Sequence, residues 1–98
     1  MIEFLYNGIR ATSGSTATIP AVITEENGDV ITEDCKLILH DKDGKEMIEE
    51  VTGSYNADTN EWTFVISATT TKELKGRYWY CIKHADVNIC FKQPIYFV

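Results

Sequence analysis

The sequence predicts an all-β protein, an antiparallel β-sandwich of about seven short strands that forms a single domain over residues 1–98. Three observations predict this class. Apolar residues recur at every second position along most of the chain, which is the period of a strand with one buried face. Turn-forming residues (Gly, Asn and Asp) separate these runs about every ten residues. No segment follows the helical period for more than a turn or two.

In the first half of the chain, two runs alternate clearly. The first run, 16–24, places four apolar residues on one face. In the second run, 35–41, Cys35, Leu37 and Leu39 share one face in the same way. Pro20 cannot donate a hydrogen bond to a neighbouring strand, so we expect it at a sheet edge or a bulge. The apolar face of the first run consists of Ala17, Ile19, Ala21 and Ile23. The strands expected here are 2–6, 16–24, 30–33 (the weakest), 35–41 and 46–52.

The second half of the chain alternates still more strongly. Trp62, Phe64 and Ile66 share one face, and a later run repeats this pattern with aromatic residues. Between these runs, 69–74 is expected to form one helical turn with a Thr as N-cap. Pro94 raises the same difficulty in the last strand as Pro20 does earlier. In the later run, 77–84, the residues that share one face are Tyr78, Tyr80 and Ile82. The strands expected here are 60–67, 77–84 and 88–97.

Charge and hydropathy exclude several classes of function. Fifteen acidic residues against nine basic ones give a net charge of −6. Nucleic-acid binding is disfavoured, because phosphate contacts need clustered Lys and Arg. No apolar run approaches the roughly 20 residues of a membrane helix. The segment 1–5 has neither a basic region nor a long apolar core, so we expect no signal peptide and no membrane partner.

Few residues are candidates for chemistry. The segment 41–46 has oxygen ligands at alternate positions and a Gly, but it is too short for a calcium loop and is expected to be a hairpin turn. His40 and His84 have no ligand partners nearby in sequence and are expected on the sheet surface. Cys81 lies three residues before His84, which places the two on opposite faces of a strand. We therefore expect no catalytic residue, metal or other cofactor.

The cysteines leave one alternative open. A two-residue turn at Ala85 and Asp86 would place Cys81 opposite Cys90, in the geometry of a cross-strand disulfide. Ala-Asp is a poor hairpin turn, and a cytosolic protein keeps its thiols reduced, so both observations weigh against the bond. Cys35 falls on a core face and is expected to be a small buried apolar residue.

The segment 74–82 has the pattern Leu-x-Gly-x-Tyr-x-Tyr-x-Ile and precedes a last hairpin that ends in an aromatic-rich strand. This pattern resembles small phage and prophage tail proteins, in particular the immunoglobulin-like N-terminal domains of baseplate upper proteins in prophages of Gram-positive bacteria. The segments 13–19, 23–29 and 61–66 resemble the family's start into strand two, its acidic Gly turn and its next strand. The likeness spans most of the chain.

The resemblance implies an immunoglobulin-like sandwich with four structural landmarks. Gly76 would allow a sharp entry into the strand, and Tyr78 would act as a tyrosine corner whose hydroxyl bonds to backbone upstream. Tyr80 stands where immunoglobulin domains proper carry a cysteine, which rules out the antibody-type disulfide. Trp62, the fourth landmark, belongs to the expected strand 60–67, which precedes the Thr-rich turn that leads to the next strand.

The function implied is a non-enzymatic structural module of a phage or prophage tail or baseplate. Its partners would be other tail proteins or further copies of itself, first in the cytoplasm of the bacterial host and then in the virion tail. Trp79, on the outer face, is the candidate interface residue, because aromatic side chains anchor interfaces. The alternative is a carbohydrate- or receptor-binding sandwich, with Trp79 as a sugar platform and calcium at Asp41 and Asp43. An enzyme is the least favoured reading, because titratable groups do not converge in a recognisable spacing.

Overall fold

The computed structural model describes residues 2–5, 8–24, 28–85, 87–88 and 93–98, with side chains described for 9–24, 28–85 and 93–98. These residues form ten strands and one short helix, α1 (Ala68–Thr71). The strands of the larger sheet are β1 (Ile2–Leu5), β2 (Gly8–Ala11), β4 (Cys35–His40), β5 (Met47–Thr52), β8 (Gly76–His84), β9 (Val87–Asn88) and β10 (Gln93–Phe97). The strands of the smaller sheet are β3 (Ala17–Ala21), β6 (Ser54–Asn56) and β7 (Glu61–Ile66).

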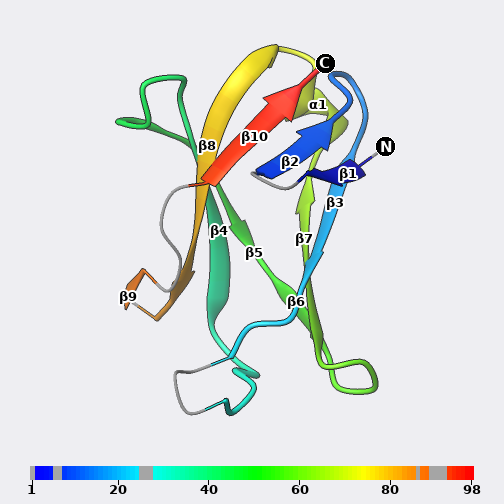
Figure 1. Ribbon diagram of the computed structural model, residues 1–98, viewed down its shortest axis with the longest axis vertical. Helices are drawn as coiled ribbons and strands as arrows, with labels where there is room; N and C mark the ends of the chain where they lie inside the picture. The colour runs from blue at the N-terminus through cyan, green and yellow to red at the C-terminus, as the bar shows by residue number, and fades with distance from the viewer. Residues whose placement is uncertain (1, 6–7, 25–27, 86, 89–92) are drawn as a thin grey trace.

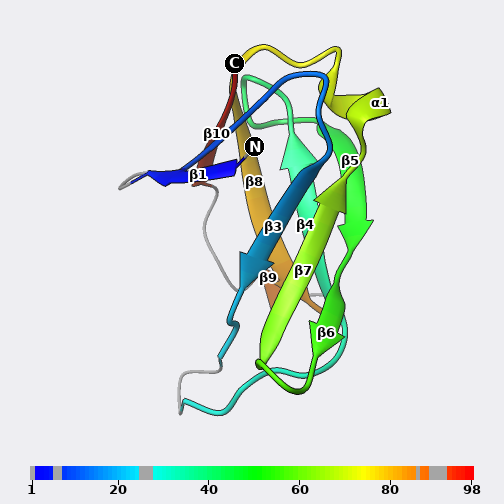
Figure 2. The same ribbon diagram turned by 90° about the vertical axis from the view of Figure 1, so that its right-hand side faces the viewer.

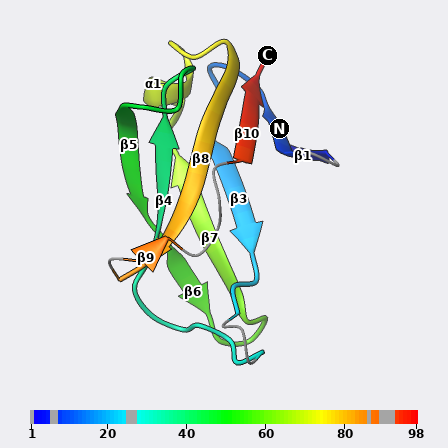
Figure 3. The same cartoon turned by 60° about the vertical axis from the view of Figure 1, so that its left-hand side comes forward.

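The two sheets pack face to face, which confirms the predicted all-β sandwich (Figure 1). Figure 2 shows the smaller sheet, in the order β3-β7-β6, in front of the larger one. Figure 3 shows the larger sheet in front, ordered β1-β2-β10-β8-β4-β5 with β9 also paired to β8. The described strands pair antiparallel except β2 with β10, and the predicted number of about seven strands is too low.

The apolar faces predicted from the period of two meet between the sheets. Leu37, Phe64 and Ile95 are each fully buried there. Apolar surface removed from water stabilises the fold by roughly 25 cal/mol per Å², so this layer supplies the main favourable term. The buried apolar cluster consists of Ile9, Ala11, Ala17, Ile19, Ile23, Ile31, Cys35, Leu37, Leu39, Val51, Trp62, Phe64, Ile66, Leu74, Tyr78, Ile82, Ile95 and Phe97.

Gly53 is where the chain changes sheets. It separates β5, in the larger sheet, from β6, in the smaller one. Its backbone N–H donates to the carbonyl oxygen of Cys35 at 3.0 Å. A Cβ at this position would lie 2.6 Å from Cε1 of Phe64 and 2.7 Å from Cε3 of Trp62. The crossover therefore needs a residue without a side chain, although the sequence pattern predicts only a turn here and misses β6.

The beginning of the chain departs from the predicted strands. β2 was not predicted, because Asn7 and Gly8 have the composition of a turn. The strand expected at 16–24 ends at Ala21, and a single bridge between Thr24 and Val30 stands in place of the strand expected at 30–33. Pro20 lies on β3, which among the described strands pairs with β7 alone and so forms an edge of its sheet, as predicted.

Two described strands, β9 and β10, lie within or beside the last predicted strand, 88–97. β9 pairs Lys83 with Asn88 and His84 with Val87, which is the register predicted for a turn at residues 85 and 86. β10 pairs Gln93 with Tyr80, a register shifted by two residues relative to β9. Residues 89–92 lie outside the described residues, so the predicted continuity of this strand stays a prediction.

The helix between β7 and β8 starts earlier than predicted. Its N-cap is Ser67, whose hydroxyl accepts from the backbone N–H of Thr70, and the predicted cap on a Thr is wrong. Thr71 is fully buried, and its hydroxyl donates to the carbonyl oxygen of Ser15 at 2.7 Å. The hydroxyl of Ser13 in turn donates to the carbonyl oxygen of Thr71 at 3.0 Å. These bonds fasten the crossover to the loop that precedes β3.

Within the described ranges, no helix combines the length and the apolar character needed to cross a membrane.

Candidate functional site

β8 divides its side chains between the core and the outer surface. Tyr78 and Ile82 are buried against the smaller sheet, and Tyr80 packs half-buried on the same cluster. Arg77 and Trp79 alternate with them and therefore lie on the outer face. The predicted faces of this strand are confirmed, including the outward position of Trp79.

The turn between β4 and β5 is organised by Asp41. Its Oδ1 accepts hydrogen bonds from the backbone N–H of Asp43 at 3.1 Å and of Lys45 at 3.0 Å. These bonds, led by the one from Lys45, hold the pKa of the Asp41 carboxyl below its ordinary value, because they stabilise the charged form. Gly44 supplies the left-handed conformation, with φ of +71°. The predicted hairpin turn is confirmed, and the Asp41 oxygen that calcium would need is occupied by the backbone.

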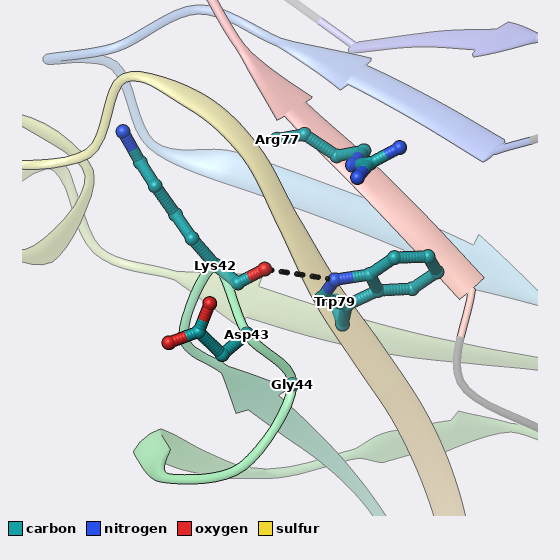
Figure 4. A pocket seen from close by; sticks show the side chains of 5 residues that line it. All are labelled: Lys42, Asp43, Gly44, Arg77 and Trp79. Atoms are coloured by element: carbon teal, nitrogen blue, oxygen red, sulfur yellow. Dashed lines mark hydrogen bonds between the residues drawn. The ribbon is translucent and has the colours of Figure 1, made fainter.

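This turn folds onto β8 and creates a pocket. The indole Nε1 of Trp79 donates to the carbonyl oxygen of Lys42 at 3.2 Å, and the Arg77 guanidinium lies 5.1 Å from the centre of the Trp79 ring. The pocket has a volume of about 400 Å³ and is lined by Lys42, Asp43, Gly44, Arg77 and Trp79 (Figure 4). Trp79 is thus half-buried between a cation and a turn, and it is less exposed than expected for a free interface anchor.

The remaining predicted landmarks of β8 lie beside this pocket. Gly76 opens the strand at φ +97°, as a sharp entry requires, and the Nζ of Lys42 lies 3.4 Å from where its Cβ would be. The same Nζ lies 5.6 Å from the centre of the Tyr78 ring, which meets Phe97 edge-on at 5.7 Å. Within the described part of the chain, the Tyr78 hydroxyl has no hydrogen-bond partner. The predicted tyrosine corner is therefore not formed with any described residue.

Trp62, the fourth landmark, lies in the core and far from the pocket in the sequence. Its ring stacks on Phe64 with centroids 6.3 Å apart and tilts against Tyr55 at 5.5 Å. Its indole Nε1 donates to the carbonyl oxygen of Ile31 at 2.7 Å. Its role is structural, as predicted.

One contact on the outer face was missed by the sequence reasoning. The Nε2 of His40 lies 3.5 Å from the Sγ of Cys81, across the β4–β8 pairing. Alternation predicts that both residues lie on the outer faces of their strands. It does not predict that β4 pairs with β8, which is what brings the two side chains together. A thiol beside an imidazole is the arrangement of a nucleophilic cysteine, but Cys81 is 5% exposed, which denies a substrate access to the sulfur. His84 lies elsewhere, with Nδ1 at 3.3 Å from the carbonyl oxygen of Asp34.

The other cysteines divide between the core and the undescribed part of the chain. Cys35 is 1% exposed, and burial, followed by the charge of Asp34, raises the pKa of its thiol. Its predicted place in the core is confirmed. Cys90 lies outside the described residues, so the predicted alternative of a bond to Cys81 stays a prediction.

The described residues contain no group of three or more His, Cys, Asp or Glu side chains that is able to hold a metal ion. Comparison of the chain with protein-family models, with curated proteins and with solved structures found no significant match. Function is therefore argued from two features of the surface: the pocket at Trp79 and the outer face of the smaller sheet.

Proposed function

We propose that this protein is a non-enzymatic structural module of a phage or prophage tail or baseplate, and that it works through protein–protein contacts. The resemblance of the segment 74–82 to tail proteins motivates the proposal, and the sandwich architecture is compatible with it. Assembly would begin in the cytoplasm of the bacterial host and end in the virion tail.

The outer face of the smaller sheet has a composition that suits assembly with another protein surface. Thr18 pairs with Val65 on this face, and Pro20 pairs with Thr63, which pairs with Ser54 in turn. These five side chains are uncharged, and Val65 is 48% exposed. The same face also carries one acidic residue, Glu61, which pairs with Asn56 at the start of β7. The cores of protein interfaces are depleted in charged residues in the same way.

A second copy of the chain is the partner that this face fits. Each copy carries a net charge of −6, so most approaches of two copies are repulsive. The uncharged part of this face, around Val65 and away from Glu61, allows two copies to approach without placing like charges opposite each other. In the described sheet β3 and β6 are the two outermost strands, and edge strands of this kind are able to pair with a further strand.

Light scattering coupled to size-exclusion chromatography tests self-assembly. The measured mass is expected to rise with concentration to that of two copies or more, and Val65→Lys is expected to abolish the rise by placing two charges face to face. Val98→Lys is the matched control, because Val98 is 53% exposed and follows β10, away from this face. A wild-type monomer at every concentration, encoded beside metabolic genes, would count against the proposal.

The pocket at Trp79 favours a second function, recognition of a carbohydrate or of a surface receptor. It is lined by the aromatic ring of Trp79 and by three residues with charged side chains. The proposed platform needs no calcium at Asp41, since the Asp41 carboxylate binds its own turn. A glycan array distinguishes this function from assembly, because array binding would be lost in Trp79→Ala and retained in Val65→Lys.

A further inference from the structure

The outer face of the larger sheet has a charge opposite to that of the molecule. Strand register places four of the nine basic residues on it, against two acidic positions, Glu3 and Glu50. The described part of this face therefore has a net charge of +2, and because the whole chain has −6, the other residues have −8. The four basic residues of this surface, the basic face, are Arg10, Lys36, Arg77 and Lys83.

The basic face holds two cations that nothing described neutralises. Lys36 and Lys83 are directly opposite each other on neighbouring strands, and like charges placed in this way are destabilising. Glu50 lies 3.5 Å from Lys36. Among the described residues, Lys83 and Arg77 have no carboxylate partner. The guanidinium of Arg77 covers the ring of Trp79, and its N–H groups point along its own plane, where they are able to bind a carboxylate.

A row of uncharged residues crosses the basic face between these cations. Arg77 and Lys83 lie six residues apart on β8, which is about 20 Å along the strand. Aromatic residues, Met and Arg are enriched in protein interfaces, and the cores of interfaces are depleted in charge. Figure 3 shows this face in front, and no described strand or helix lies over it. Its composition indicates that it binds a protein surface. The row consists of Pro94, Trp79, His40 and Met47, which is 57% exposed.

One end of the sandwich has the complementary charge. Figure 2 shows the β3–β4 link and the β6–β7 turn at this end, and the bond from Trp62 to Ile31 joins them. The described residues here, 22–24, 28–34 and 57–61, include five acidic residues and no basic one. Val22 lies among them and is 58% exposed. The acidic residues of this surface, the acidic end, are Asp29, Glu33, Asp34, Asp58 and Glu61.

We propose that the acidic end of one copy of the chain binds the basic face of a second copy. Carboxylates of the acidic end pair with Arg77 and Lys83, and Val22 packs on the uncharged row between them. Two copies of net charge −6 repel each other in most orientations, and this orientation brings opposite charges together. The two surfaces differ, so the contact is heterologous and continues from copy to copy into a ring or a filament.

This inference rests on the proposed role in assembly, but the contact is separate from the one at Val65. Sedimentation velocity of Val65→Lys, in which the contact of the smaller sheet is removed, therefore tests it. At about 20 mM salt the average mass is expected to rise with concentration to two copies or more, and at about 0.5 M salt to stay that of a monomer, because salt screens the charges. The higher salt is the condition in which the test of assembly at Val65 reports on the smaller sheet alone.

Neutral substitutions added to Val65→Lys identify the two surfaces. Arg77→Gln with Lys83→Gln is expected to weaken association about tenfold or more. Glu33→Gln with Asp58→Asn is expected to do the same, although it lowers the net negative charge by two and so reduces general repulsion. An equal mixture of the two double variants is expected to form a complex of two copies and no larger one, because each variant supplies the surface that the other lacks.

Lys45→Gln with Lys72→Gln is the matched control, because it removes two exposed cations from the β4–β5 turn and the end of α1, outside the basic face. Its association is expected to stay within about twofold of that of Val65→Lys. A loss equal to that of Arg77→Gln with Lys83→Gln would indicate an effect of net charge alone and would overturn the inference.

Three further results would overturn it: no association of Val65→Lys at low salt, association that persists unchanged at high salt, and a mixture of the double variants that stays monomeric. A single-stranded oligonucleotide that binds more tightly than a second copy, and is lost in Arg77→Gln with Lys83→Gln, would assign the basic face to nucleic acid instead. Wild-type protein that is monomeric at high salt, together with association of Val65→Lys at low salt, would refute the contact at Val65 and support this one.

Discussion

The indole Nε1 of Trp62 donates a 2.7 Å hydrogen bond to the main-chain carbonyl oxygen of Ile31, and both groups are buried. This bond joins β7 of the smaller sheet to the link between β3 and β4. Ile31 is also held by its own backbone N–H, which donates to the carbonyl oxygen of Ile23 at 2.8 Å. Trp62 thus holds Ile31 in place, in the part of this link that the structure describes.

Replacement of Trp62 by Phe is expected to lower the free energy of unfolding by about 2–3 kcal/mol, because the carbonyl of Ile31 is left buried without a donor and the smaller ring leaves space. Urea denaturation followed by circular dichroism measures the loss. Trp79→Phe is the control, since it removes a hydrogen bond at the surface and is expected to cost about 1 kcal/mol or less. Equal losses in the two variants would contradict the structural role given to Trp62.

Substitution of Gly53 by Ala is expected to destabilise the protein by about 1–3 kcal/mol through overpacking. The added methyl group would lie 2.6 Å from Phe64 and 2.7 Å from Trp62, inside van der Waals contact. Thermal denaturation of Gly53→Ala, alone and combined with Phe64→Leu, provides the measurement. The smaller Leu is expected to relieve the contact, so the cost of the Ala substitution falls in the double variant; strictly additive costs would show that no such contact exists.

Replacement of Tyr78 by Phe is expected to change stability by less than about 0.5 kcal/mol, since the hydroxyl has no partner among the described residues. Tyr78→Ala is expected to cost about 3–5 kcal/mol, because the ring is buried against Phe97. Chemical denaturation of both variants measures the difference. A tyrosine corner makes the opposite prediction, a loss of about 1 kcal/mol or more from the hydroxyl alone.

Asp41 is expected to make stability depend on pH in the acid range. Its folded pKa lies below the value of about 3.9 typical of an unfolded chain. Its contribution is therefore fully present above about pH 4 and disappears as the pH falls through the folded pKa. Asp41→Ala should be less stable than wild type at pH 7, and the two should converge at low pH in urea melts. Asp43→Ala is the control, since its side chain does not cap the turn, and a gap that persists at the lowest pH would refute the assignment.

Much of the fold follows from local pattern. The alternation around Phe64 and Tyr78 specifies which side chains face the core, because successive residues of a strand point to opposite sides. The hairpin at 41–46 follows from Asp-Gly chemistry in the same way. β6 was missed because a strand of three residues, Ser54–Asn56, is too short to show an alternating pattern, and because Gly53 beside it indicates a turn.

The pocket and the His40–Cys81 contact were not predictable in this way. Each joins residues about 40 positions apart, on strands whose neighbours are set by the topology. Sequence analysis identified Trp79 as an outer aromatic and 41–46 as a turn, but local pattern does not reveal that the two lie together. Arg77 and Lys42 were missed for the same reason, because an isolated cation in a sequence looks like any other surface charge.

The sequence by itself determined the class of the protein: an acidic β-sandwich whose alternating residues define two apolar faces. Period and composition are local properties, and each residue contributes to them without reference to distant partners. The tertiary structure decided the order of the strands, the change of sheet at Gly53 and the union of Lys42 with Trp79. These depend on which strands pair across long loops, and that choice is made by the packing of the whole core rather than by any single segment.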